Sequence, residues 1–270
     1  MATGSRSPTA HDDDLAPVLR DIGMGRLAST RAKLANSTET RAFLEIGLDL
    51  LRVDLLQHTG PDFDSGSRSA LFESVSRERI LERAGGGRAL SVNMFRYRWD
   101  RKDRYTEDLI SYMFRLAPHR RHLELMDRTC DELMRTLSLA DLVRAVSAVE
   151  VDSIVADPLI SVQSVIQGAL PNHPRVREFC QAQLDQLLPI WAGVYEKVAG
   201  NYGLRLRPGL TWLDIAVVFN TIIEGELAWA RVGGRPRLSS GDHVLAATIL
   251  ALVPSLWEGA PEDLTTLYRV

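Results

Sequence analysis

The sequence of 270 residues lacks the features of a secreted or membrane-spanning protein. Its two cysteines, Cys130 and Cys180, are too few for a disulfide framework, and its N-terminus has no basic stretch followed by an apolar one. The longest nearly uncharged apolar stretch, residues 244–257, is shorter than the ~20 residues that span a bilayer. We therefore expect a cytoplasmic protein with no membrane partner and with buried, unreactive thiols.

Patterns of catalytic or cofactor-binding residues are missing as well. No Ser/His/Asp set in the order of a catalytic triad stands out, and neither does a nucleotide-binding motif. The glycines at 85–87 are not followed by the Gly-Lys-Ser/Thr of a phosphate loop. His119 and His122 lie three residues apart near Glu124, but zinc sites usually recruit three or four ligands and no further cluster is present. We expect no enzyme activity, no cofactor and no metal, and we interpret the two histidines as part of a solvated helix surface.

What is present is an ordinary globular composition, with 45 % hydrophobic and 25 % charged residues. This composition excludes wholesale disorder, and the length suits one large domain or a small module with a larger one. Apolar residues recur at helical spacing, and no run of alternating strand residues occurs. The expected helices span residues 38–56, 139–156, 158–170, 174–199, 211–231 and 240–257. The predicted fold class is all-α.

Five polar residues are spaced as helix caps. Thr211 with Asp214, and Ser239 with Asp242, have the spacing of capping boxes before the last two helices. Asp100 has the position of an N-cap for a helix that continues to Pro118.

Positive charge is concentrated in one segment of an acidic chain. The net charge is −3, but residues 76–104 contain nine basic and four acidic side chains, so this segment carries +5 and the remainder −8. Such a cationic region is expected of a nucleic-acid-binding module, although a solvated helix face has the same charge. The same segment reads as a helix, a glycine turn and a second basic helix, which is the arrangement of a helix-turn-helix.

The chain resembles the tetracycline-repressor (TetR/AcrR) family of transcriptional regulators. The pieces ERAG, FRYRW and RKDRYTEDLI are similar to the family's second to fourth helices, and TRAFLEIGLDLL is similar to its first. Near the other end, NYGLRLRPGLTWLDIAVVFNTIIEGELAWARVGG is similar to the ligand-binding domains of many members. The resemblance implies an N-terminal helix-turn-helix DNA-binding module, then a helical-bundle domain that binds a ligand and dimerises. It implies a repressor that binds a near-palindromic operator in double-stranded DNA as a homodimer and responds to a small hydrophobic ligand.

The expected organisation follows from this resemblance. We expect a disordered or weakly helical arm over residues 1–36, the helix-turn-helix module over 37–104, the ligand-binding and dimerisation domain over 105–262 and a tail over 263–270. The basic residues of the arm could add minor-groove or phosphate contacts, with a disordered tail as the alternative; they are Arg20, Arg26, Arg31 and Lys33. The chain departs from the family by an insert at 61–69 and by about four extra residues between Gly85 and Trp99.

Three sets of candidate residues result. Arg and Asn side chains can make bidentate contacts to bases, and a lysine at a helix start can meet a phosphate. The DNA-binding candidates are Arg88, Ser91, Asn93, Arg96, Tyr97, Arg98, Arg101 and Lys102. The candidates for the ligand pocket, chosen as aromatic and flexible apolar side chains, are Met126, Met134, Phe179, Leu187, Trp191, Tyr195 and Trp229. The candidates for the dimer interface are Trp212, Ile215, Phe219, Ile222, Leu245, Ile249 and Leu252, which could instead complete the core of the monomer.

Two other functions stay open at this point. One is an all-α enzyme that uses a bundle pocket for chemistry on an apolar substrate. The other is an all-α dimeric ligand-binding or interaction protein whose helix-turn-helix is degenerate and no longer binds DNA.

Overall fold

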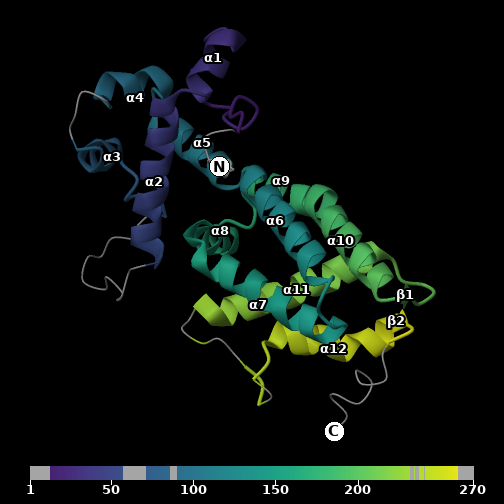
Figure 1. Ribbon diagram of the computed structural model, residues 1–270. Helices are drawn as coiled ribbons and strands as arrows, with labels where there is room; N and C mark the ends of the chain where they lie inside the picture. Colours follow the sequence, from purple (N-terminus) through teal and green to yellow (C-terminus); the bar gives the residue numbers. More distant parts are fainter. Residues whose placement is uncertain are drawn as a thin grey trace, which may run out of the picture. The chain divides into compact units, whose positions relative to one another are not determined.

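The computed structural model describes residues 13–56, 71–85, 90–231, 234, 237–239 and 241–260, and these fold mainly into α-helices (Figure 1). The prediction of an all-α fold is confirmed. The strands of the described residues are the two-residue β1 (Arg205–Leu206) and β2 (Trp257–Glu258), which pair antiparallel. The helices form two compact units, each interrupted in the sequence by the other.

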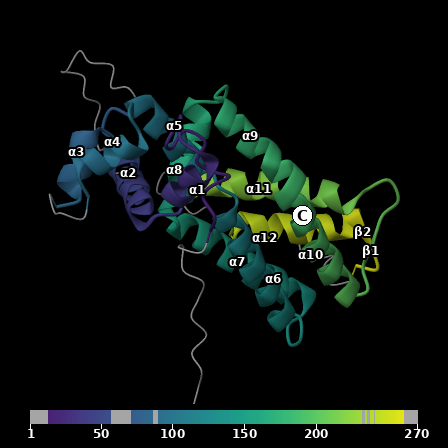
Figure 2. The same ribbon diagram turned by 90° about the horizontal axis from the view of Figure 1, so that it is seen from above.

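The N-terminal unit comprises the described residues up to Ala117 together with Pro158–Phe179. Its elements are α1 (Ala28–Ala35), α2 (Thr38–Leu56), α3 (Arg77–Arg83), α4 (Val92–Arg98), α5 (Lys102–Met113), α8 (Pro158–Ala169) and most of α9 (Pro174–Ala182). The long helix α2 packs against α1, α3, α5 and α8, and α3 packs against α4 (Figure 2). This unit is larger than the expected module of residues 37–104, because α5 and α8 share a core with α2.

Four aromatic side chains form the centre of this unit. Phe43 of α2 contacts Phe95 and Trp99 edge-on, and Tyr105 lies 5.0 Å from the rings of both Phe95 and Trp99. The Tyr105 hydroxyl donates a 2.7 Å hydrogen bond to the carbonyl of Phe43. A Cβ at Gly47 would overlap this hydroxyl, so the close approach of α5 to α2 requires glycine there. The aromatic cluster therefore sets the position of α4 and α5 on α2.

The described part of the N-terminal arm, residues 13–36, folds onto this unit. Leu15, Leu19 and Ile22 recur at helical spacing and are almost completely buried. The expected weak helix is present as α1, but the segment as a whole is not a loose arm, because its apolar side chains complete the core. The predicted tail at 263–270 and the insert at 61–69 lie outside the described residues.

The C-terminal unit comprises Pro118–Asp157 and the described residues from Cys180 onward. Its elements are α6 (Ala117–Leu133), α7 (Leu139–Ala156), the π-helical η1 (Gln183–Leu187), α10 (Leu188–Asn201), β1, α11 (Trp212–Arg231), α12 (Val244–Leu256) and β2. Helix α11 packs against α7, α10 and α12 (Figures 1 and 2). The stretch expected as one helix over 174–199 is thus α9, η1 and α10.

One of the two predicted capping boxes is present. The amide of Asp214 donates to Thr211 Oγ1 at 3.2 Å, and the amide of Thr211 donates to Asp214 Oδ2 at 2.8 Å. The second prediction is wrong because a tertiary contact takes its place. Glu226 of α11 is buried and accepts a 2.7 Å hydrogen bond from the amide of Leu245 in the first turn of α12.

The remaining groups at these helix starts also have other partners. Glu226 pairs with His243 at 2.9 Å, and Asp242 accepts a hydrogen bond from Arg144 of α7. The predicted cap at Asp100 is wrong as well. Arg101 occupies the N-cap position of α5, and Asp100 forms an ion pair with Arg104.

Candidate functional site

The helix pair α3 and α4 forms where the sequence predicts a helix-turn-helix. Ser76 and Ser91 cap the two helices, accepting hydrogen bonds from the amides of Arg79 and Met94. Gly85 follows the end of α3 with a positive φ of 77°, a backbone conformation that suits glycine. Ile80 of α3 and Phe95 of α4 are buried, so the side of each helix that carries them packs in the core and the opposite side is exposed.

The predicted DNA-binding residues have different positions on this pair. Arg88 lies outside the described residues, and Ser91 is the cap of α4. The predicted residues with exposed side chains are Asn93, Arg96, Tyr97, Arg101 and Lys102. Asn93, Arg96 and Tyr97 are three and four residues apart on α4 and therefore share its outer face.

Arg98 does not belong to this face, and its prediction as a DNA contact is wrong. Its side chain is 6 % exposed, and the guanidinium donates to Thr40 Oγ1 at 2.8 Å, to Ser37 Oγ at 2.9 Å and to Glu39 Oε2 at 3.0 Å. A fourth hydrogen bond goes to the carbonyl of Met94. Arg98 therefore joins α4 to the start of α2. The sequence does not reveal this role, because Arg98 is one of several arginines in a basic segment.

Carboxylates neutralise many of the cations of the basic segment. Arg77 pairs with Glu78, Arg83 with Asp49, Arg101 with Asp103 and Arg104 with Asp100. Within the described ranges, no ion pair is formed by Arg79, Arg96 or Lys102, which are all exposed. The positive field of the surface therefore comes from fewer residues than the sequence count implies.

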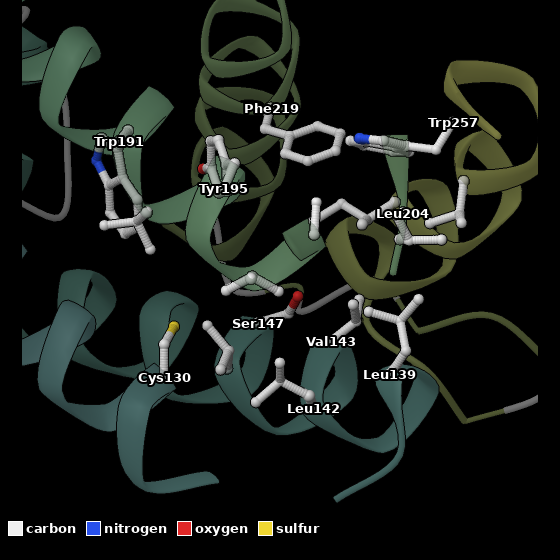
Figure 3. Close-up of a pocket in the computed structure, with 16 residues that line it drawn as sticks. Cys130, Leu139, Leu142, Val143, Ser147, Trp191, Tyr195, Leu204, Phe219 and Trp257 are labelled. Carbon is white, nitrogen blue, oxygen red and sulfur yellow. The ribbon is translucent and has the colours of Figure 1, made fainter. Parts of the chain in front are cut away.

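A second candidate site is an apolar cavity of about 90 Å³ inside the C-terminal unit (Figure 3). Its wall is formed by α6, α7, α10, α11, α12 and β2. The side chains shown around it include Leu139, Val143, Ser147, Trp191, Tyr195, Leu204, Phe219 and Trp257. Tyr195 stacks on Trp191 at 5.6 Å and meets Phe219 edge-on at 5.1 Å. The lining of the cavity is almost wholly apolar, so the space is suited to an apolar guest.

Trp257 is the one lining residue whose polar atom is buried without a hydrogen-bond partner in the described structure. Its indole nitrogen lies on the side of the ring that faces Phe219 (Figure 3). A buried N–H without an acceptor is costly, by about 1–3 kcal/mol. An acceptor brought by a guest molecule would remove this cost.

Two of the predicted ligand residues, Trp191 and Tyr195, line the cavity. The others lie elsewhere: Met126 and Leu187 are buried outside its wall, Met134 is half-buried, Phe179 packs on Phe114 in the N-terminal unit, and Trp229 is 65 % exposed. The sequence analysis missed the wall from α7 and the end of α12. The apolar period of residues 139–156 was visible, but periodicity does not say which buried residues border empty space.

The predicted dimer-interface residues pack within the C-terminal unit instead. Ile215, Phe219 and Leu245 are almost fully buried there, and Trp212, Ile222, Ile249 and Leu252 are half-buried against the same core. This packing favours the alternative that both stripes complete the core of the monomer, and the use of these residues in a dimer stays a prediction. The outer face of α11 carries other exposed apolar residues, namely Leu213, Val217, Val218 and Trp229. We call these four residues the α11 outer face.

The predicted setting holds for Cys130, which is buried, but not for Cys180, which is half-buried, nor for His122. His122 pairs with the buried Glu150 at 2.6 Å, so the interpretation of a merely solvated surface is wrong for it. Burial lowers the pKa of His122, but the hydrogen bond to Glu150 and the negative charges of Glu150 and Asp157 together outweigh it, so the pKa lies above its ordinary value. Burial raises the pKa of Cys130 to about 11. No group of three or more metal-ligating side chains occurs in the part of the chain that the structure describes.

Comparison with family models, curated proteins and solved structures finds no match to this chain. Among the described helices, none has the length and apolar character that crossing a membrane demands.

Replacing Arg98 by alanine should lower the free energy of unfolding by about 2–3 kcal/mol, because it removes a charged donor from the buried Thr40 hydroxyl and from Glu39. Arg96→Ala is the control on the same helix and should change it by less than about 0.5 kcal/mol, since that side chain is exposed. Urea unfolding followed by circular dichroism measures both. Equal effects of the two variants would contradict the structural role of Arg98.

Proposed function

We propose that the protein is a homodimeric transcriptional repressor of the TetR/AcrR type, whose affinity for its operator is changed by a small hydrophobic ligand. The observation that carries the proposal is the outer face of α4. It presents Asn93, Arg96 and Tyr97 while Phe95 and Arg98 hold the inner face in place. Asn and Arg side chains on the second helix of such a pair are suited to base edges in the major groove.

Lys102 supports the same proposal. It is exposed in the first turn of α5, where the amides of a helix N-terminus and an ammonium group can act on one phosphate. A short reading helix flanked by such a contact is held in register on the duplex, because phosphate contacts position a protein while base contacts specify the sequence.

The alternative is an interaction protein with a degenerate helix-turn-helix. The ion pairs of Arg77, Arg83, Arg101 and Arg104 favour it, because cations already paired with carboxylates attract DNA less strongly. DNA binding itself distinguishes the two functions.

Selection from a pool of random duplexes should enrich a near-palindrome whose half-sites lie ~34 Å apart, or a multiple of that distance, because a two-fold protein imposes its symmetry on the site. Arg96→Ala or Asn93→Ala should cost ~1–3 kcal/mol of preference at one base pair, whereas Lys102→Ala should weaken all sequences alike. Arg128→Ala, an exposed arginine of the C-terminal unit, is the control. Absence of any enriched sequence and of salt-sensitive binding would support the alternative.

The dimer is proposed to form through the α11 outer face. Exposed apolar patches on soluble proteins mark interaction sites, and this one lies along a single helix. Gly225 lies on the same helix, and a Cβ added there would meet nothing within 4 Å among the residues that the structure describes. A helix of a second copy can therefore approach closely at Gly225, although no helix of the same unit does.

Val217→Asp should convert the dimer to a monomer at micromolar concentration, because it buries an unpaired carboxylate in the proposed interface. Val165→Asp is the matched control, since Val165 is comparably exposed but lies on α8 of the N-terminal unit. Light scattering gives the mass of each variant. A dimer that survives Val217→Asp, or a wild-type monomer, would refute this interface.

The ligand is proposed to enter the cavity at Tyr195 and Trp257. At about 90 Å³ the cavity is smaller than usual ligand pockets of ~300 Å³ or more, so binding must move wall side chains apart. The apolar wall favours a hydrophobic body, and the unpartnered indole of Trp257 favours one hydrogen-bond acceptor on it. A ligand that needs a wider spacing of α7, α10 and α11 binds the conformation with that spacing more tightly. It can therefore shift the protein between a DNA-binding and a non-binding conformation by the difference between its two affinities.

Acetophenone should stabilise the protein more than ethylbenzene of similar shape, and Trp257→Phe should abolish this difference because it removes the donor. A hundredfold excess over Kd corresponds to about 2.7 kcal/mol of stabilisation, which thermal unfolding detects. Leu125→Ala is the control, since Leu125 is exposed on α6 of the same unit and outside the cavity wall. Equal shifts for both compounds in the wild type would contradict the role of the indole.

A further inference from the structure

The loop that precedes α1 is bound to the end of the reading helix α4. The amide of Gly23 donates a 2.8 Å hydrogen bond to the carbonyl of Arg98, the last residue of α4. Gly23 and Gly25 both have positive φ, 57° and 81°, which allows the chain to turn sharply there. The turn brings Arg26 to the side of α4.

Arg26 stacks on Tyr97, with its guanidinium carbon 3.7 Å from the centroid of the ring. Tyr97 is 48 % exposed and shares the outer face of α4 with Asn93. Stacking on a ring fixes the plane of a guanidinium but leaves the N–H groups at its edge available to an anion. Arg26 is itself exposed and forms no ion pair with any residue that the structure describes.

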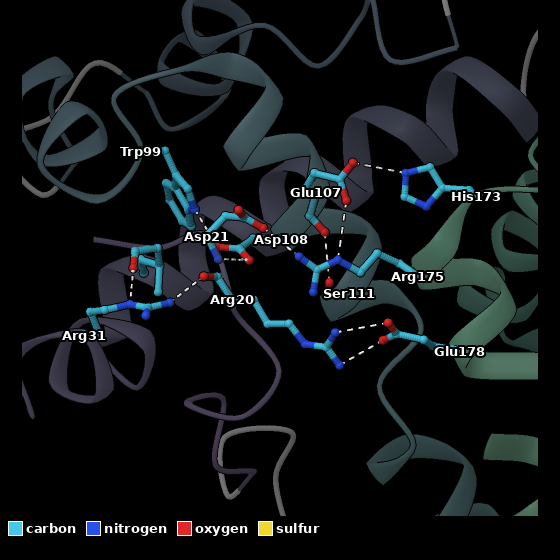
Figure 4. Close-up of polar contacts among 11 residues, drawn as sticks. Arg20, Asp21, Arg31, Trp99, Glu107, Asp108, Ser111, His173, Arg175 and Glu178 are labelled. Carbon is cyan, nitrogen blue, oxygen red and sulfur yellow. Dashed lines mark hydrogen bonds and ion pairs between the residues drawn. The ribbon is translucent and has the colours of Figure 1, made fainter. Parts of the chain in front are cut away.

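The other arginines of the same segment are engaged within the protein. Arg20 forms an ion pair with Glu178 of α9, and the Arg31 Nε donates to the carbonyl of Ile22 at 3.0 Å (Figure 4). These contacts hold the segment, whereas the charge of Arg26 is oriented but not neutralised.

Further polar contacts anchor the loop from behind (Figure 4). Buried Asp108 of α5 accepts hydrogen bonds from the amide of Asp21 and from the indole of Trp99, both at 2.9 Å. Arg175 of α9 pairs with Asp21 at 2.7 Å. The segment is therefore positioned when the unit folds, and its ordering adds no entropic cost when a partner binds.

We propose that the loop at residues 23–27 is a second DNA-contacting element, in which Arg26 binds a backbone phosphate beside the bases that α4 reads. The inference rests on the proposed DNA binding and adds a named contact to it. Phosphate is the expected partner because Arg26 lies beside α4, whose own side chains face the bases, and a planar guanidinium matches two phosphate oxygens. Such a contact carries no information about the sequence of the bases.

The test is the salt dependence of binding to the selected operator and to an unrelated duplex, measured by fluorescence anisotropy. Arg26→Ala should weaken both complexes by the same factor, about fivefold, and should reduce the log–log salt slope by about 0.9. Arg26→Lys should keep most of the slope because it keeps the charge. Arg20→Ala is the matched control, since Arg20 already pairs with Glu178 and should leave the slope unchanged.

A role limited to holding Tyr97 would give a different result. Arg26→Ala would then change the preference for particular bases and leave the slope unchanged, and Tyr97→Ala would reproduce its effect. That outcome, or wild-type affinity and slope in Arg26→Ala, overturns the inference while DNA binding stands. A wild-type protein that binds no DNA refutes both the proposed function and this inference. Wild-type protein that binds an acidic peptide more tightly than DNA, through Arg26, overturns the inference and identifies a protein as the partner.

Discussion

The buried guanidinium of Arg98 is the interaction on which the arrangement of the N-terminal unit depends. It lies at the end of α4 and reaches Ser37, Glu39 and Thr40 at the start of α2, so one side chain joins two helices through several hydrogen bonds. A buried charge with a full set of partners tolerates little displacement, because each lost partner leaves a desolvated group behind. The aromatic cluster around Phe43 fills the space beneath, and Gly47 permits its closest contact. The contacts on the inner face of α4 thus fix the direction in which its outer face points.

The same end of α4 also binds the N-terminal segment, through the carbonyl of Arg98 and the amide of Gly23. Asp108 links that segment to Trp99, and burial raises the pKa of this carboxyl to about 6, although its hydrogen bonds from Trp99 and Asp21 lower it. Asp21 of the N-terminal segment therefore binds α5 through its amide, at Asp108, and α9 through its carboxylate, at Arg175. Arg175 of α9 is therefore connected through Asp21 and Asp108 to Trp99, the residue that follows α4.

In the C-terminal unit, the strongest apolar stripes serve the core rather than a partner. Phe219 and Leu245 are the kind of residues that a helical period reveals, and they are buried because a chain covers its largest apolar side chains first. The outer face of α11 carries fewer apolar residues, and polar ones such as Asp214 and Asn220 lie among them. Sequence periodicity ranks helix faces by hydrophobicity, and the first-ranked face of α11 is the one that packs in the core.

The sequence by itself determined the helices, because their period and punctuation are local: the residues 38–56 and 139–156 are helices with the predicted bounds, and the Thr211–Asp214 box caps α11. It also placed Asn93, Arg96 and Tyr97 among the candidates, and their three- and four-residue spacing puts them on one face once the bounds of α4 are known. Only the tertiary structure decided that Arg98 is buried, that Glu226 caps α12, and which side chains border the cavity. Glu226 and Leu245 are 19 positions apart in the sequence, and Arg98 and Ser37 are 61 positions apart. No local spacing encodes the distance between two helices that pack together.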